Sequence, residues 1–168
     1  MTGVQTCALP ISTTMTTLKE QLTYEEGRRL ITYLCSRQHK TIGIGHNLDV
    51  KPYFRGVKIP NVITDTFCDD LFNDDVKDIT AALEALYPNL HNLDAARRDA
   101  LINMAFQLGA LGVSKFKEML DALDDKDWEK AYTEALNSNW AVQTPNRAKR
   151  VASQLLTGEY YHVEKDSI

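Results

Sequence analysis

The chain has 168 residues, of which 43% are hydrophobic and 25% are charged. These proportions are typical of an ordinary globular protein, and the length suits a single domain with a hydrophobic core. The net charge of −4 gives no general attraction to nucleic acid or to an anionic membrane, so neither is expected as a partner. No segment approaches the roughly 18 consecutive apolar residues of a transmembrane helix, so membrane insertion is not expected.

The cysteines point to free thiols. Cys7, Cys35 and Cys68 are an odd number and lack the spacing of a metal site. This usage fits a reducing compartment. The histidines show no ligand spacing either. The sequence therefore predicts no metal and no cofactor.

Residues 1–14 are predicted to be a non-native N-terminal extension. They have neither the basic start nor the long apolar stretch of a secretory signal peptide, and they carry no amphipathic pattern. We therefore expect a single domain over residues 15–168, in which residues 159–168 form a loosely held tail.

The first half of the chain is predicted to contain a short helix, a small sheet and a long helix. Leucines at helical spacing predict a helix over residues 17–26. Residues 31–48 alternate in polarity and contain two glycines, which favours a small antiparallel sheet. Residues 49–62 are predicted to be a loop, because they contain two prolines and a glycine. Thr64 is predicted to cap a helix over residues 65–87, where apolar residues follow a 3.6-residue period.

The second half is predicted to be helical. Asp94 is expected to cap an apolar, central helix that ends at Gly109. Further helices are predicted from Ser114 to Leu123, from Asp125 or Lys126 to about Leu136, and from Thr144–Pro145 to Thr157–Gly158.

Three chemically useful side chains lie close together in the sequence. Glu26 ends the first predicted helix, Cys35 follows nine residues later, and Thr41 opens the alternating run TIGIGH. A carboxyl group, a thiol and a hydroxyl are thus carried on a helix end and a hairpin that can fold over it. These three groups are suited to acid–base chemistry on a substrate that lies between the helix end and the hairpin. The neighbouring Glu25 lacks this spacing and is expected on the surface.

The spacing Glu-x8-Cys-x5-Thr resembles the catalytic motif of the phage lysozymes of glycoside hydrolase family 24, the type found in T-even coliphages. The resemblance extends over roughly residues 18–160, through LFNDDV, LDAARRDALINMAFQLG and W-x-x-QTPNRAKRV. It implies a mainly helical α+β fold of two lobes, with a small three-stranded antiparallel sheet in the first. The implied N-terminal lobe covers about residues 17–63, the linking helix about 65–87 and the C-terminal helical lobe about 88–160.

The resemblance also implies roles for individual residues. Glu26 would be the general acid, Cys35 would stand in place of the usual aspartate, and Thr41 would position the attacking water. The sequence leaves open whether Cys35 activates water or attacks the sugar itself. The other positions that match the family are substrate-binding Phe106 and Gln107, a structural pair His46 and Asp75, and Arg147 as the ion-pair partner of Glu26.

The implied activity is that of an endolysin, a muramidase that cleaves the β-1,4 bond between N-acetylmuramic acid and N-acetylglucosamine in peptidoglycan. Such an enzyme is expected to be a monomer that accumulates in the host cytoplasm. A holin would then release it to the periplasm and cell wall. Three positions depart from the residues with which the family touches substrate: Asn47, Met119 and Glu134.

The residues leave two other functional hypotheses open. One is a cysteine hydrolase with Cys35 as the nucleophile and His39 or His46 as the base. The other is a peptidoglycan-binding module that has lost catalysis, because Cys35 replaces an aspartate.

Overall fold

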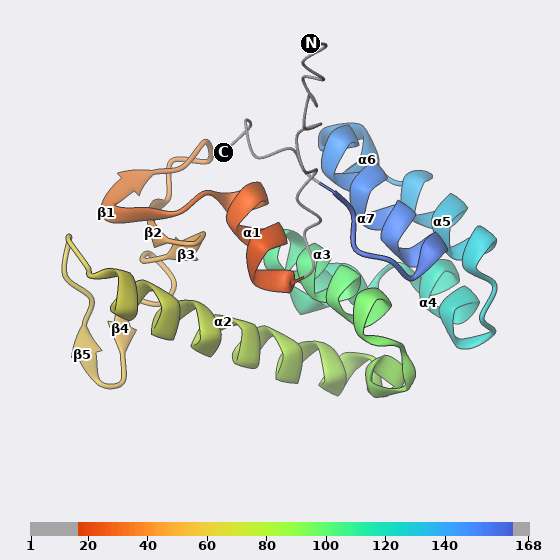
Figure 1. Cartoon of the computed structure of the whole chain (residues 1–168), viewed down its shortest axis with the longest axis horizontal. Helices are drawn as coiled ribbons and strands as arrows, with labels where there is room; N and C mark the ends of the chain where they lie inside the picture. Colours follow the sequence, from red (N-terminus) through yellow and green to blue (C-terminus); the bar gives the residue numbers. More distant parts are fainter. Residues whose placement is uncertain (1–16, 163–168) are drawn as a thin grey trace, which may run out of the picture.

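Two hydrophobic clusters organise the computed structural model, which describes residues 17–162 (Figure 1). The smaller cluster lies in the N-terminal lobe, around the fully buried Leu22 and Ile42. The larger one fills the helical C-terminal lobe around Leu101 and Met104. The predicted α+β, mainly helical fold with two lobes is therefore confirmed. The prediction for residues 1–14 lies outside the described residues.

The N-terminal lobe begins with α1 (Leu18–Glu26), followed by strands β1 (Arg29–Leu34), β2 (Lys40–Gly43) and β3 (His46–Asn47). The strands form one antiparallel sheet in the order β1-β2-β3. The predicted helix and sheet are thus present. Helix α1 ends because Gly27 adopts φ 76° and ψ 170°, a conformation that is accessible essentially to glycine alone.

The loop predicted over residues 49–62 is wrong in its centre. There β4 (Tyr53–Phe54) and β5 (Val57–Lys58) form a two-stranded hairpin. Its two turn residues, Arg55 and Gly56, have φ of 49° and 81°, as a tight hairpin turn with two positive φ angles requires. Phe54 is anchored by an edge-to-face contact with Phe67, whose ring centroid lies 5.2 Å away. This ring contact holds the hairpin against the first turn of the helix that starts at Asp65.

Helix α2 (Asp65–Leu86) joins the lobes and runs along the lower side of Figure 1. The Thr64 side chain accepts from the amide of Phe67, so the predicted cap is present. Near its start α2 contributes Leu71 and Phe72 to the smaller cluster, and near its end it contributes Leu83 to the larger one. Among the described residues, no helix has the length and apolar character needed to cross a membrane.

The C-terminal lobe surrounds α3 (Ala95–Ser114), whose Asp94 cap accepts from the amide of Arg97. The remaining helices are η1 (Pro88–Asn92), α4 (Lys117–Asp124), α5 (Trp128–Leu136), α6 (Asn139–Gln143) and α7 (Pro145–Thr157). Neither η1 nor α6 was predicted, since a five-residue helix has too few positions to show a period.

Three predicted helix boundaries differ in this lobe. Gly109, with φ 75°, kinks α3 rather than ending it, and the helix resumes to Ser114. Ser114 caps nothing, because its hydroxyl donates to the carbonyl of Leu111 at 2.7 Å. Helix α5 is capped by Asp127, which accepts from the amide of Lys130, and not by Asp125 or Lys126.

The predicted loose tail is wrong for its first residues. The hydroxyl of Tyr160 donates to Asp99 Oδ2 at 2.6 Å, and that of Tyr161 donates to Glu25 Oε1 at 3.0 Å. Both contacts connect the end of the described chain to residues far away in the sequence. Residues 163–168 lie outside the described part.

Candidate active site

The predicted catalytic residues line a single cavity of about 580 Å³. Its walls come from the C-terminal end of α1, the β1–β2 hairpin, α3 and the start of α7. Six of the eight predicted site residues meet there: Glu26, Cys35, Thr41, Phe106, Gln107 and Arg147. The other two, His46 and Asp75, line an adjoining hollow.

Glu26 is the last residue of α1, and its side chain is 23% exposed. Arg147 Nη1 donates to Glu26 Oε1 at 2.7 Å. On the other side lies Gly45, at which an added Cβ would come within 3.1 Å of the Glu26 side chain, including Oε2. Gly45 also has φ 69°, which disfavours other residues. The hairpin therefore approaches the carboxyl group closely because this position is a glycine.

Arg147 is fixed by its own partners. Its side chain is 8% exposed. Nε donates to Asn103 Oδ1 at 3.0 Å, and Nη2 donates to the Asn103 carbonyl at 3.1 Å. Asn103 is fully buried on α3. The Arg147 guanidinium, which binds Glu26 at the end of α1, is thus oriented by α3, the central helix of the C-terminal lobe.

The expectation that Glu25 lies on the surface is wrong. Its side chain is 6% exposed and accepts from Arg150 Nε and Nη2, each at 2.9 Å. It also accepts from Tyr161, whose hydroxyl accepts in turn from Asn103 Nδ2 at 3.2 Å. One hydrogen-bonded chain therefore runs from Glu25 through Tyr161, Asn103 and Arg147 to Glu26.

Both acidic residues lie at the C-terminal end of α1, where the helix dipole disfavours negative charge. Arg147 and Arg150 supply the compensating charge. No local pattern marks this pairing, because Arg150 is 125 residues away from Glu25 in the sequence.

Cys35 lies in the turn between β1 and β2. The amide of Cys35 donates to the His39 carbonyl at 3.0 Å, which closes the turn. The pKa of the Cys35 thiol is lowered, chiefly by hydrogen bonding from the His39 backbone and further by the Arg37 backbone and the Thr41 hydroxyl. Fixed donors around sulfur favour the thiolate, which is the reactive form.

Thr41 is 5% exposed, and its hydroxyl donates to the His39 carbonyl at 3.0 Å. The Thr41 hydroxyl also contributes to the lowered pKa of the Cys35 thiol. The remaining lone pairs of Thr41 Oγ1 are available to a water molecule.

The geometry does not favour a cysteine–histidine pair. Both ring nitrogens of His46 are engaged, Nδ1 with Asp75 Oδ2 at 2.6 Å and Nε2 with the Lys51 carbonyl at 2.8 Å. His39 lies 3.4 Å from Asp49. Within residues 17–162, no hydrogen bond joins the Cys35 thiol to either imidazole.

The cavity continues past Phe106 and Gln107 into the adjoining hollow, of about 610 Å³. Gln107 is held in one orientation, since Trp140 Nε1 donates to its Oε1 at 2.8 Å and its Nε2 donates to Thr144 Oγ1 at 3.3 Å. Asn47 lines both spaces. The two hollows also share Gly45, so they form one continuous cleft.

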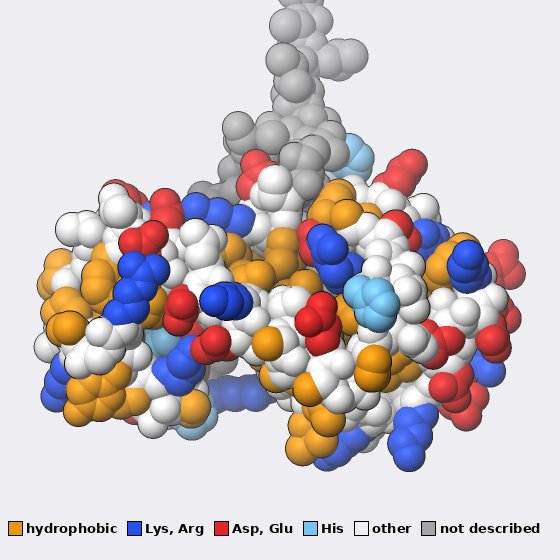
Figure 2. All heavy atoms as spheres, turned by 90° about the horizontal axis from the view of Figure 1, so that it is seen from below, with side chains coloured by type: hydrophobic (Ala, Val, Ile, Leu, Met, Phe, Trp, Pro, Cys, Tyr) orange, Lys and Arg blue, Asp and Glu red, His pale blue; other side chains and the backbone are white. Residues whose placement is uncertain are grey.

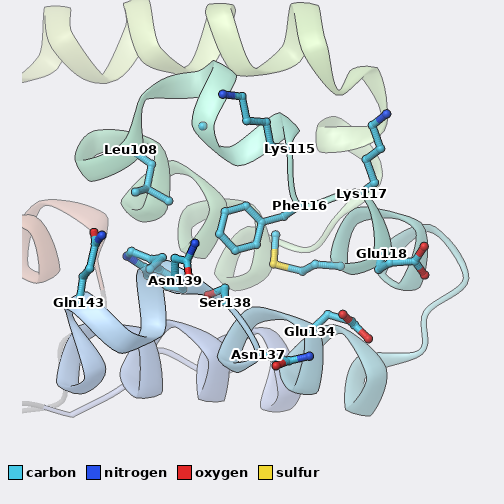
Figure 3. Close-up of a pocket in the computed structure, with 13 residues that line it drawn as sticks. Leu108, Lys115, Phe116, Lys117, Glu118, Glu134, Asn137, Ser138, Asn139 and Gln143 are labelled. Atoms are coloured by element: carbon cyan, nitrogen blue, oxygen red, sulfur yellow. The ribbon is translucent and has the colours of Figure 1, made fainter.

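A third hollow of about 480 Å³ lies within the C-terminal lobe (Figure 3). Glu134 lines it, on the same side as Glu118. Met119 also borders it but is fully buried. Because a buried thioether offers no strong polar group, Met119 supplies no polar contact to a ligand in this hollow. In the described part of the chain, no group of three or more His, Cys, Asp and Glu side chains is placed to hold a metal ion.

Comparison with known proteins agrees with this geometry. Residues 23–156 match the family described as phage lysozyme. Two proteins of Dictyostelium discoideum, named probable T4-type lysozymes 2 and 1, are 36% and 35% identical to this chain, and each comparison covers 86% of this chain and 96% of the relative. The pre-baseplate central spike protein Gp5 of Enterobacteria phage T4 is 36% identical over 88% of this chain, but the matched region is 29% of that protein. The resemblance inferred from the motifs is confirmed, and this chain belongs to the phage lysozyme family.

Proposed function

We propose that this lysozyme hydrolyses the β-1,4 bond between N-acetylmuramic acid and N-acetylglucosamine in peptidoglycan, with Glu26, Cys35 and Thr41 as its catalytic residues. One observation carries the assignment. A carboxyl group, a thiol of lowered pKa and a buried hydroxyl line one cavity in a chain of the phage lysozyme family.

Glu26 is the general acid in this proposal. Its carboxyl proton moves to the glycosidic oxygen as the bond from that oxygen to the anomeric carbon breaks. Arg147 remains beside the carboxylate that forms, at the 2.7 Å contact described above. It thereby offsets the negative charge that appears on Glu26 during the reaction.

Cys35 and Thr41 hold the attacking water. The water oxygen bonds to the anomeric carbon, and its proton passes to the Cys35 thiolate. Support comes from the two groups themselves, because Thr41 offers an acceptor lone pair and the lowered thiol pKa provides a base. The proton gained by Cys35 balances the one that Glu26 gives up. A single displacement of this kind inverts the anomeric configuration.

The biological role that we propose is host-cell lysis by an endolysin. The protein would act as a monomer, accumulate in the cytoplasm of the infected cell and reach the periplasm and wall through a holin. Membership of a phage family supports this setting. Coexpression with and without a holin, followed by lysis and fractionation, tests it: lysis that is independent of the holin would contradict it.

Glu26→Gln tests the catalytic assignment. The amide keeps the shape of the side chain but donates no acidic proton, so a folded Glu26→Gln protein should clear permeabilised cells at least about 100-fold more slowly. Glu84→Gln, which removes an exposed glutamate from α2, is the matched control and should retain full activity.

Product analysis separates the three possible activities. New reducing ends identify a glycosidase, and their initial anomeric form, read by NMR, identifies inversion. New amino termini would instead identify a peptidase. Binding to the wall without clearing would identify a module that lacks catalysis. Near-native clearing by Glu26→Gln would reject the assignment of Glu26.

A further inference from the structure

The charges of this acidic protein are unevenly distributed. Residues 17–63 contain eight Lys and Arg against four Asp and Glu, whereas residues 64–162 contain ten against seventeen. Figure 2 shows acidic side chains on both lobes, with a dense group at the right-hand end of the helical lobe. Aspartates of α2 pair with four of the basic residues in 17–63, namely Lys19, Arg28, Lys51 and Arg55, so the charge that matters for a ligand is the charge that faces the cleft.

Inside the 580 Å³ cavity the acidic side chains are already paired. Glu25 binds Arg150 and Glu26 binds Arg147. The same cavity is lined by Arg29 and Arg37, which form no ion pair within the described part of the chain. The uncompensated charge facing the cavity is therefore positive.

These two arginines belong to one wall of the cavity. Arg29 lies on β1 and stacks over the Tyr33 ring, with 4.4 Å between its guanidinium carbon and the ring centroid. Tyr33 lines the cavity as well. Stacking leaves the edge of the guanidinium, with its N–H donors, free for a ligand. Arg37 is exposed in the turn that follows Cys35.

We propose that Arg29 and Arg37 bind a carboxylate of the glycan strand beside the cleaved bond, so that the enzyme prefers acidic glycans to neutral ones. This inference rests on the proposed function. A guanidinium presents paired donors that match a carboxylate. Peptidoglycan offers carboxylates from two sources: the stem peptide, and the lactyl group of those muramic acids that carry no stem, because the stem is attached through that lactyl carboxyl. Either carboxylate would supply the negative charge that Arg29 and Arg37 lack on this side of the cavity.

The test measures kcat/KM on two substrates that differ only in charge: soluble peptidoglycan fragments, and the same fragments with their carboxylates converted to methylamides. The ratio of the two values measures carboxylate recognition. Arg37→Gln and Arg29→Gln should each lower this ratio roughly fivefold, as expected for one partly exposed charged contact. Lys40→Gln is the matched control. It removes the same charge from the same hairpin but lies outside the cavity, and should leave the ratio unchanged.

A third substrate identifies the source of the carboxylate. Removal of the stems with an amidase takes away every stem carboxylate and frees the lactyl carboxylate of muramic acid. If the arginine effect persists on stripped glycan, the arginines accept a lactyl carboxylate, and if it disappears, they bind the stem peptide alone. Either result supports the proposal. A ratio that neither arginine variant changes overturns it, as does an equal loss in Lys40→Gln, because general attraction would then explain the preference.

Binding distinguishes failure of this inference from failure of the proposed function. Sedimentation with insoluble native and amidated peptidoglycan at 4 °C measures recognition without requiring turnover. Selective binding that depends on Arg37, in a protein that releases no reducing ends, would contradict the muramidase proposal alone. Hydrolysis with no carboxylate selectivity would contradict the inference alone.

Discussion

Cys35 occupies the position at which the family resemblance implies an aspartate. The turn around Cys35 makes its thiol more acidic than a free thiol. Backbone donors and the Thr41 hydroxyl lower its pKa. At a given pH the thiolate is therefore more populated than for a free thiol, whose pKa is about 8.5. A carboxylate is fully charged at neutral pH, whereas the charge of the thiol varies with pH in the neutral to alkaline range.

This property makes Cys35 testable by substitution. Cys35→Asp should retain activity, because a carboxylate supplies the same charge and accepts a proton from water. Cys35→Ala supplies neither and should lose about 100-fold in kcat. Full activity of a folded Cys35→Ala protein would show that the thiol has only a structural role.

Alkylation provides an independent measurement. The thiolate is the species that reacts, and its fraction grows as pH rises through the pKa. Inactivation by iodoacetamide should therefore accelerate with pH, with a midpoint below that of a free thiol measured in parallel. Cys68 is fully buried, and burial raises its pKa, so it should react slowly. A Cys68→Ser background removes it entirely. Verified alkylation of Cys35 with full retention of activity would contradict its catalytic role.

The two adjacent glutamates show how far the surroundings of a single residue can be predicted from the sequence. The motif spacing singles out Glu26, and its contact with Arg147 could be expected from the resemblance. The burial of Glu25 could not, because it depends on Arg150 and Tyr161, which are 125 and 136 residues away. Long-range partners decide whether a carboxylate can be buried, and no local pattern reports them.

At the scale of elements, the end of α1 is held by a network that includes the last described residues of the chain. Tyr161 connects Glu25 to Asn103, and the amide of Asn103 orients Arg147. Tyr161 does not line the cavity. Its hydroxyl therefore influences the reaction only indirectly, through Glu25 and through the positions of Arg147 and Glu26.

Tyr161→Phe should lower kcat several-fold while leaving KM near its native value, because the substrate contacts remain. The matched control is Tyr160→Phe, which also removes a hydrogen bond from a tyrosine to a carboxylate, that of Asp99. Each variant should lose about 1.5 kcal/mol of stability, measured by urea unfolding. Equal kcat values for the two would show that the network is structural only.

The start of a helix could be predicted where a capping side chain next to it in the sequence determines it. The caps Thr64 and Asp94 bind the amides of Phe67 and Arg97. Ser114 has the same capping chemistry, yet its hydroxyl binds a carbonyl of the preceding turn. The β4–β5 hairpin was missed because its turn requires a positive φ at Arg55, which is uncommon for a residue other than Gly, Asn or Asp.

For the whole molecule, the lobes are joined by two helices rather than one. Helix α2 contributes to both hydrophobic clusters, and Leu18 of α1 also packs against both. In addition, Gln21 Nε2 of α1 donates to Gln154 Oε1 of α7 at 2.6 Å, and both side chains are buried. The resemblance implied the two lobes and the linking helix. The role of α1 as a second connection follows only from the packing.

The last prediction concerns where the functional chain begins. Thr17 caps α1 by accepting from the amide of Glu20 at 3.2 Å, and α1 carries Glu26 at its other end. A protein that starts at Met15 keeps this cap, so it should equal the full chain in melting temperature and lytic rate. Adding Thr17→Ala to it should cost about 1 kcal/mol and lower the melting temperature by roughly 2–4 °C. That variant calibrates the assay, because it shows the size of effect that a frayed α1 produces. A comparable loss in the Met15 protein itself would show that residues 1–14 contribute to folding and are not a dispensable extension.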